Sequence, residues 1–362
     1  MAPHRILITG VSGYIGGTIL STLLQTDEPW VKNLEISALV RKASQAETVA
    51  ALGVQAVLFD SLNQSDRLEL IGQDFDIIVH AAAGWHELSA RSLITGMGKR
   101  REKAGKAVHY LHISGTSNVS DRPHTQGYVE SRTFSDAEDI YSYEKYRQSF
   151  EVYPQRSTDI TVVETGEALG VSTYIVMAPT LFGLGTGSFN RYSIPIGAML
   201  GPALKQGHVA VLGEGKTVWS HIHIEDLAAL FIVLLKNIEL ENNVPQGRKG
   251  IYFSATGEHT HLEFSERMAQ ACYELKLLPS ASVKQVGLEE AANNWVNGIQ
   301  NMAELAYGAN ARTKSVLGPK LGWKHQHEDK WESTFVAEVE AVHTHPPAER
   351  SLGDIFEALG EK

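Results

Sequence analysis

Short apolar, β-branched runs alternate with amphipathic segments over the first half of the chain. The runs predict strands at Arg5–Thr9, Glu35–Val40, Val54–Phe59, Asp76–Ala81, Ala107–Ile113 and Ser172–Met177. Between Tyr14 and Gln25 the apolar residues recur at spacings that place them on one face of a helix. A further helix is expected from about Asp159 to Gly170. Strands that are apolar throughout and separated by helices favour an α/β fold with a doubly wound parallel sheet.

The pattern becomes less regular from Gly183 onward. A helix is expected over Glu225–Lys236, a strand over Gly250–Ser254 and further helices after His261. We therefore expect a first domain over residues 1–182 and a smaller, irregular portion over 183–345 that shapes the substrate site. Some segments of this portion are expected to return to the first domain. Residues 346–362 are expected to form a terminal helix or tail.

The charge of the chain excludes some classes of ligand. Lysine and arginine total 32 against 42 aspartate and glutamate residues, giving a net charge of −10, so no nucleic-acid partner is expected. The single cysteine, Cys272, excludes an intrachain disulfide and a cysteine-rich metal site. The sequence shows neither a membrane-length apolar stretch nor a secretory leader. We expect a cytoplasmic protein without membrane attachment.

A glycine-rich segment, Gly-Val-Ser-Gly-Tyr-Ile-Gly, stands between the first expected strand and the first expected helix. Gly10 allows a tight turn, Gly13 lets the backbone approach a pyrophosphate, and Gly16 lets the helix pack closely on the sheet. Free N–H groups at the start of the helix favour phosphate charge. We therefore predict a Rossmann-type dinucleotide-binding domain. The expected cofactor contacts are Gly10, Ser12, Gly13, Tyr14, Ile15 and Gly16.

Two cations follow the second expected strand, Arg41 and Lys42. An acidic residue at this place would accept hydrogen bonds from the adenosine ribose, whereas Arg41 can pair with a 2′-phosphate. This favours NADP over NAD as the cofactor. Asp60, at the end of the third strand, is expected either to hydrogen-bond the adenine amino group or to cap the next turn.

Five segments, in order, resemble the extended or atypical short-chain dehydrogenase/reductase superfamily, in particular its epimerase/dehydratase-like and dihydroflavonol-reductase-like members. The resemblance covers nearly the whole chain, up to about Trp323. The segments are Thr9–Gly17, His80–Ala83, Ile113–Ser117, Ala178–Gly183 and Trp219–Ala228.

The resemblance implies roles for several positions. The cofactor path would be lined by Ala81, Ala82, Ala83, Pro179 and Thr180. The hydroxyl of Thr116 would hydrogen-bond the substrate oxygen as negative charge develops there. Many members of the superfamily are dimers through helices of the nucleotide domain, so a homodimer is expected.

Members of this superfamily use a Tyr-x-x-x-Lys dyad on one face of a helix, in which the lysine lowers the tyrosine pKa. Tyr141 and Lys145 have this spacing. Counting back from Gly170, which ends the corresponding helix, instead points to Glu151 and Gln155. Two explanations stay open: either an insertion after Lys145 leaves Tyr141 and Lys145 catalytic on a separate turn, or the dyad has been lost. Tyr153 is then the reserve candidate for the acid.

Residues after the fourth and sixth strands are candidates for substrate contact, because ligands bind beyond the carboxyl ends of parallel strands. Trp85 could stack on a planar substrate, and His86 could donate to a carbonyl. Asn190 lies in the segment after the sixth expected strand. Several His-x-His pairs occur, but nothing in the sequence brings three or four ligands together, so no metal site is expected.

These observations favour an NADP(H)-dependent oxidoreductase that reduces a small carbonyl substrate, or oxidises the corresponding alcohol. One alternative is an epimerase, dehydratase or isomerase that retains NAD(P). Another is a non-catalytic NAD(P)-sensing regulatory protein, which a lost dyad would favour.

Overall fold

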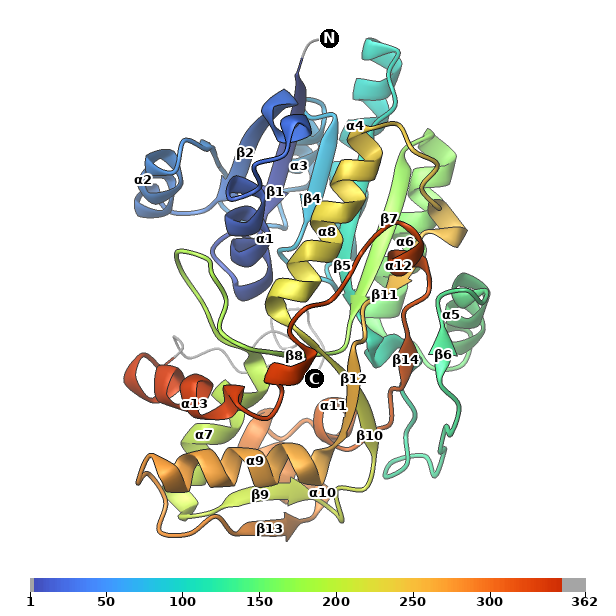
Figure 1. Cartoon of the computed structure of the whole chain (residues 1–362). Coiled ribbons are helices and arrows are strands. Elements are labelled where there is room, and N and C mark those ends of the chain that lie inside the picture. The colour runs from blue at the N-terminus through green and yellow to red at the C-terminus, as the bar shows by residue number, and fades with distance from the viewer. Residues whose placement is uncertain (1–2, 347–362) are drawn as a thin grey trace.

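A parallel sheet of seven strands forms the centre of the computed structural model, which describes residues 3–346 (Figure 1). The strand order is β11-β7-β5-β4-β1-β2-β3. The strands span His4–Thr9 (β1), Leu34–Val40 (β2), Gln55–Leu58 (β3), Ile77–His80 (β4), His109–Gly115 (β5), Ser172–Ala178 (β7) and Ile251–Phe253 (β11). The predicted α/β, doubly wound architecture is therefore confirmed.

Helices cover both faces of this sheet, because side chains alternate between the two faces along each strand. Ile6 and Ile8 of β1 pack in one core with helices α1 and α8, whereas Leu7 packs in another with α3, α4 and α6. The helices of the large sheet span Tyr14–Leu24 (α1), Ala43–Ala51 (α2), Ser65–Gly72 (α3), Glu87–Ala104 (α4), Pro154–Leu169 (α6) and Ile224–Glu239 (α8).

The segment between β5 and β7 differs from the sequence-based expectation. It contains two helices, α5 (Ile140–Gln148) and α6, and α6 begins at Pro154 rather than near Asp159. Proline at the first helical position is favoured because its fixed φ suits the helix and its missing N–H needs no partner. The helix ends as expected at Gly170, where φ is +67°. Helix α5 is therefore an additional element that precedes α6.

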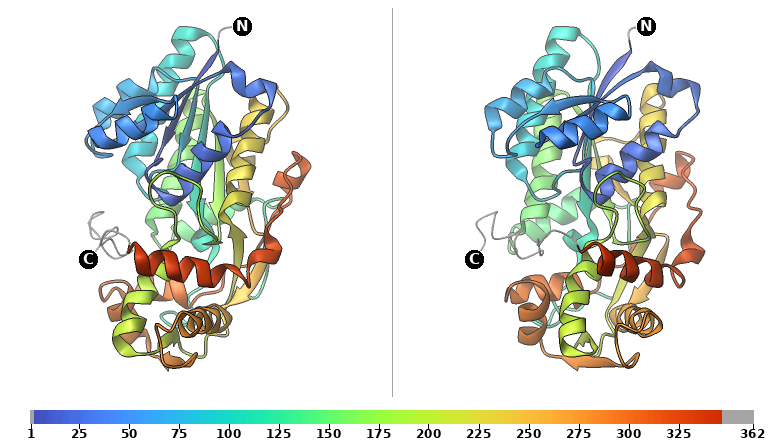
Figure 2. Two further views of the ribbon diagram at one scale, coloured as in Figure 1. Left: turned by 60° about the vertical axis from the view of Figure 1, so that its left-hand side comes forward. Right: turned by 90° about the vertical axis from the view of Figure 1, so that its left-hand side faces the viewer.

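The second half of the chain divides between the large sheet and a smaller portion beyond its carboxyl ends (Figure 2). Helix α8 and strand β11 return to the large sheet. The smaller portion has its own apolar core, to which Trp295 and Phe335 belong. Its helices are α7 (Ile194–Gln206), α9 (His261–Glu274), α10 (Leu288–Trp295), α11 (Gln300–Tyr307) and α13 (Thr334–Thr344).

The remaining elements are short. Small sheets have the orders β12-β10-β8, β13-β9 and β14-β6. Their strands are β6 (Phe134–Ser135), β8 (Thr180–Phe182), β9 (Val209–Leu212), β10 (Val218–His223), β12 (Gly257–Thr260), β13 (Val283–Val286) and β14 (Thr313–Lys314). The short helices are η1 (Pro29–Asn33), η2 (Thr116–Val119), η3 (Gly247–Lys249), α12 (Leu317–Lys320) and η4 (Glu328–Lys330).

Within residues 3–346, the helices are all too short or too polar to cross a lipid bilayer. The expected terminal helix or tail over 346–362 lies, apart from its first residue, outside the described residues.

Candidate active site at the carboxyl end of the large sheet

The glycine loop connects β1 to α1 and lies against the end of β4. Gly10 has a φ of +73°, and a Cβ atom there would meet the carbonyl oxygen of Ala81 at 2.5 Å. Both the left-handed backbone and this close approach require glycine. The loop therefore adopts a tight turn, which leads into the N-terminus of α1 at Tyr14, where backbone N–H groups are free to bind an anion.

A second segment lies over this loop. The backbone N–H of Asn190 donates to the carbonyl oxygen of Ser12 at 3.4 Å, and the Tyr14 hydroxyl donates to the carbonyl oxygen of Gly183. The backbone N–H of Gly183 in turn donates to the buried carboxyl of Glu338 on α13 at 2.6 Å. Segment 183–190 therefore links the glycine loop to the smaller portion. Asn190 therefore lies beside the glycine loop, and its side-chain oxygen accepts a hydrogen bond from the backbone N–H of Tyr192 at 3.3 Å.

The cations after β2 are exposed. The backbone N–H groups of Arg41 and Lys42 each donate to the side-chain oxygen of Gln45 at 3.1 Å, which fixes the turn. Neither side chain takes part in an ion pair within the described part of the chain. Both are therefore available for a phosphate. Asp60 accepts a hydrogen bond from Gln64 at 3.0 Å, so it caps the turn that follows β3.

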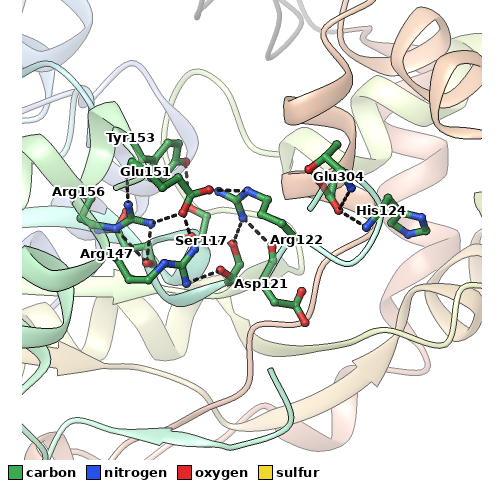
Figure 3. A network of polar contacts seen from close by, with 12 residues as sticks. Ser117, Asp121, Arg122, His124, Arg147, Glu151, Tyr153, Arg156 and Glu304 are labelled. Carbon is green, nitrogen blue, oxygen red and sulfur yellow. Dashed lines mark hydrogen bonds and ion pairs between the residues drawn. The ribbon is translucent and has the colours of Figure 1, made fainter. Parts of the chain in front are cut away.

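At the end of β5, the structure brings a tyrosine to a serine. The Tyr153 hydroxyl lies 3.1 Å from the Oγ of Ser117, and that Oγ donates to the side-chain oxygen of Gln155 at 2.6 Å (Figure 3). Thr116, which sequence analysis favoured for the substrate oxygen, is only 1% exposed. Its neighbour Ser117 is half-buried and is the hydroxyl that meets the tyrosine.

Glu151 lies beside this pair within a cluster of arginines (Figure 3). Its carboxylate forms ion pairs with Arg122 at 2.8 Å, with Arg156 at 3.4 Å and with Arg147. Burial by itself would raise the pKa of Glu151, but these guanidiniums outweigh burial and hold the pKa below its usual range. Glu151 is thus a fixed carboxylate that neutralises part of a strongly positive region next to Tyr153.

Tyr141 and Lys145 are not part of this arrangement. Both lie on α5, where the Tyr141 hydroxyl donates to Glu164 at 2.9 Å and Lys145 pairs with the same oxygen at 2.8 Å. Burial, together with the bond to Glu164, raises the pKa of Tyr141 to about 12. Arg248, just before β11, covers the tyrosine ring at 4.8 Å. The additional helix thus carries the Tyr-x-x-x-Lys spacing to the outer side of α6, and the structure does not bring the proposed dyad to the carboxyl end of the sheet.

The candidate substrate residues after β4 have structural partners. The Nδ1 of His86 accepts from the N–H of Ser89 at 3.1 Å and caps α4, while its Nε2 lies 2.9 Å from Asn63. Since both ring nitrogens are used, the prediction that His86 donates to a substrate carbonyl is not supported by its geometry. Trp85 is half-buried beside Gly84. Ala81, Ala82 and Ala83 follow β4 next to the glycine loop. Pro179 joins β7 to β8, and Thr180 is the first residue of β8.

One group of side chains within residues 3–346 could hold a metal ion: His223, Glu225 and His327. The Nδ1 of His223 faces the backbone N–H of Glu225 at 3.3 Å, and the Nδ1 of His327 pairs with Asp226 at 2.9 Å. The two imidazole rings stack with centroids 4.5 Å apart. Stacked rings direct their in-plane nitrogens alongside each other rather than to one point, so this geometry serves the cap of α8 better than a cation.

The glycine loop and the seven-stranded sheet place the chain among dinucleotide-binding folds, and comparison with known proteins narrows this further. The model of the NAD-dependent epimerase/dehydratase family matches residues 6–245. The chain belongs to this family. The family and its structural neighbours are enzymes of the extended short-chain dehydrogenase/reductase superfamily, as the sequence motifs implied.

Two curated relatives of this chain are named for different activities. The chain is 25% identical over 337 residues to the oxidase ucsJ of Acremonium sp, which covers 88% of the chain and 92% of the relative. It is 35% identical over 79 residues, 22% of each chain, to a 4-hydroxy-2-methyl-3-oxo-4-farnesyl-3,4-dihydroquinoline-1-oxide ketoreductase of Stigmatella aurantiaca.

Solved structures of other proteins have the same fold as this chain over nearly its whole length. The dTDP-glucose 4,6-dehydratase DesIV of Streptomyces venezuelae, solved with NAD, is 17% identical with a TM-score of 0.63 and covers 94% of this chain and 97% of its own. The UDP-glucuronic acid 4-epimerase of Bacillus cereus, also solved with NAD, is 12% identical with a TM-score of 0.60. The match covers 93% of this chain and 99% of the epimerase chain.

Sequence reasoning missed Ser117 and the arginine cluster around Glu151. The count back from Gly170 did point to the stretch 151–155, where the structure places Glu151, Tyr153 and Gln155. The choice of hydroxyl could not be made from sequence, because Thr116 and Ser117 are adjacent and the 3₁₀ turn of η2 decides which of them faces Tyr153.

Proposed function

We propose that this protein is an NADP(H)-dependent oxidoreductase that reduces the carbonyl group of a small molecule, or oxidises the corresponding alcohol. The observation that supports it is the contact between Tyr153 and Ser117 at 3.1 Å, at the end of β5 and on the same edge of the sheet as the glycine loop. A hydroxyl pair of this kind can hold a carbonyl oxygen and supply a proton to it.

The residues present fit a phosphorylated dinucleotide. The glycine loop leaves its backbone N–H groups for the pyrophosphate, and Arg41 and Lys42 are exposed without ion-pair partners within the described residues. NADPH, when bound, supplies the hydride. Ser117 would donate to the substrate oxygen in place of its bond to Gln155, and Tyr153 would give that oxygen a proton. The guanidinium of Arg156, 5.6 Å from the Tyr153 ring, would stabilise the phenolate that remains.

A fluorescence titration of cofactor-free protein with NADPH, and separately with NADH, tests the cofactor. We expect NADPH to bind at least about tenfold more tightly, about 1.4 kcal/mol. A panel of small carbonyl compounds, followed by NADPH absorbance, then tests the reaction. Equal binding of both cofactors would remove the roles of Arg41 and Lys42. A persistent failure to oxidise NADPH with any carbonyl would contradict the reductase activity.

Family membership supports a second enzymatic function, an epimerase or dehydratase that retains its NAD(P) through the reaction. Such an enzyme should be purified with nucleotide bound and should not consume NADPH. The displaced Tyr-x-x-x-Lys spacing supports a third, a non-catalytic sensor of NAD(P), which should bind the oxidised and reduced cofactors with different affinity and show no turnover. Measuring the nucleotide content of the purified protein separates the first two.

A further inference from the structure

A second polar cluster adjoins the Ser117–Tyr153 contact through Asn118, the residue after Ser117. Asp159 of α6 accepts hydrogen bonds from the hydroxyl of Ser114 at 2.6 Å and from the side-chain amide of Asn118 at 2.7 Å. The same amide nitrogen donates to Glu144 of α5 at 2.7 Å. Glu144, Asp159 and Asn118 are all 0% exposed. Two buried carboxyl groups therefore meet at a single amide donor.

The surroundings of the two carboxyls hold little positive charge. The charged and titratable groups that face them are His112 and Tyr110 from β5 and Arg156 from α6. The Nε2 of His112 lies 3.7 Å from Asp159, and burial lowers the pKa of this histidine to about 4, so it is neutral near pH 7. Arg156 is a cation that acts on both carboxyls, and its guanidinium donates to the backbone carbonyl of Asn118.

Each carboxyl also has one buried oxygen without a hydrogen-bond partner among the described residues, Oε2 of Glu144 and Oδ1 of Asp159. A carboxylate can only accept hydrogen bonds, so a proton on one of the two carboxyls would supply the donor that these oxygens lack. Burial raises the pKa of both Glu144 and Asp159, and the charge of Asp159 raises that of Glu144 further. Two carboxylates that accept from the same amide nitrogen would lie close together in a dry interior and would repel each other strongly.

We propose that Glu144 and Asp159 share a single proton at neutral pH, and that this buried pair positions η2 and thereby the Ser117 hydroxyl. The proposal rests on the proposed function for the role of Ser117, but the shared proton itself does not depend on it. Asn118 is the next residue after Ser117, and its amide donates to both carboxyls. Loss of the proton to solvent leaves two carboxylates on one donor and pushes α5 away from η2.

Infrared spectroscopy of the full chain in deuterated buffer tests the shared proton, because the carbonyl stretch of a protonated carboxyl lies apart from the carboxylate bands. In Asp159→Asn, the new side chain accepts from Ser114 and Asn118 and donates to Glu144, which can then ionise. We expect the difference spectrum between the native chain and Asp159→Asn at pH 7 to show one protonated carboxyl lost. The matched control is Glu164→Gln on the exposed side of α6, where Glu164 pairs with Lys145 and no protonated band should disappear.

The pH profile of NADPH-dependent turnover tests the positioning role. The native chain should lose activity on the alkaline side, approaching about tenfold per pH unit for one essential proton. The double variant Asp159→Asn, Glu144→Gln no longer has the buried pair to ionise, so its alkaline decline should begin at a higher pH than that of the native chain. If the infrared band is absent, the shared proton is wrong. If the infrared band is present but the native chain and the double variant have the same pH profile of turnover, only the positioning role is wrong.

Failure of the proposed function gives a different result, namely no turnover in any variant while the infrared band persists. Should Asp159→Asn fail to fold, Glu144→Gln provides the same comparison from α5. The band of this pair is followed against pH in the difference spectrum between the native chain and Glu144→Gln, which cancels the band of Glu338, a second buried carboxyl with a raised pKa. A band unchanged from pH 7 to strongly alkaline conditions would contradict the titrating pair.

Discussion

At the scale of single residues, the proposed chemistry depends on which hydroxyl groups meet at the end of β5. The sequence offers four tyrosines between 141 and 153, and spacing alone favours Tyr141. The structure distinguishes them by partner: Tyr141 donates to Glu164 on the outer side of α6, whereas Tyr153 faces Ser117. Contacts of this kind depend on the path of the chain through α5, which no local pattern encodes.

Replacing Tyr153 with Phe should therefore lower turnover by about 10²- to 10⁴-fold, the usual contribution of a general acid, while NADPH binding remains. Steady-state kinetics with the best carbonyl substrate measures this effect. Tyr141→Phe is the matched control and should leave turnover within about twofold. A larger loss of turnover in Tyr141→Phe than in Tyr153→Phe would indicate that Tyr141 on α5 is the general acid instead.

The proposed preference for NADP rests on Arg41 at the same scale. Arg41→Ala removes an exposed cation that has no ion-pair partner within residues 3–346, so the fold should be unaffected. We expect the Kd for NADPH to rise about tenfold, which corresponds to about 1.4 kcal/mol, and the Kd for NADH to stay the same. An equal loss for both cofactors would indicate damage to the loop rather than loss of a phosphate contact.

At the scale of elements, the large sheet and its flanking helices could be predicted from the apolar runs alone, since strands buried on both faces have few polar residues. The glycine loop was also predictable, because its function requires particular backbone conformations. The additional helix α5 was not. Its apolar residues, Ile140 and Tyr141, are too few for a clear helical period, and its cap at Asp139 resembles an ordinary turn.

The glycine loop gives a testable contrast with another left-handed glycine. Gly10 and Gly53 both have positive φ, +73° and +78°, but a Cβ on Gly53 meets nothing within 4 Å. Gly53→Ala should cost about 1 kcal/mol of unfolding free energy from backbone strain alone. Gly10→Ala adds the collision with Ala81 and should cost more and abolish NADPH binding. Denaturant unfolding and the NADPH titration measure both, and equal losses would contradict the close approach.

At the scale of the whole molecule, stability should depend on buried titratable groups. Burial lowers the pKa of His109, His112, His221, His223 and His261 to about 4. The unfolded chain binds protons at these sites below about pH 6.5, before the folded chain does, so the unfolding free energy decreases as pH falls from there.

Buried carboxyl groups act in the opposite direction. Burial raises the pKa of Glu338 to about 7 and that of Asp136 to about 6, so their contribution is complete below about pH 4.5 and is lost as pH rises through these values. Within the described residues, histidines with a lowered pKa outnumber carboxyls with a raised pKa. The loss of unfolding free energy at acid pH therefore outweighs the loss at alkaline pH. We expect maximal stability near pH 6 to 7, measured by urea unfolding at pH 5, 6.5 and 8.5. A continuous increase in stability below pH 6 would contradict this balance.

The return of α8 and β11 to the large sheet has a consequence for how the protein can be divided. The chain leaves the sheet after β7, comes back for these two elements, and leaves again for the rest of the smaller portion. A fragment ending at residue 182 would expose the apolar face that Leu227 and Phe231 cover, and it should aggregate. The smaller portion is therefore not a module that a single cut can exchange.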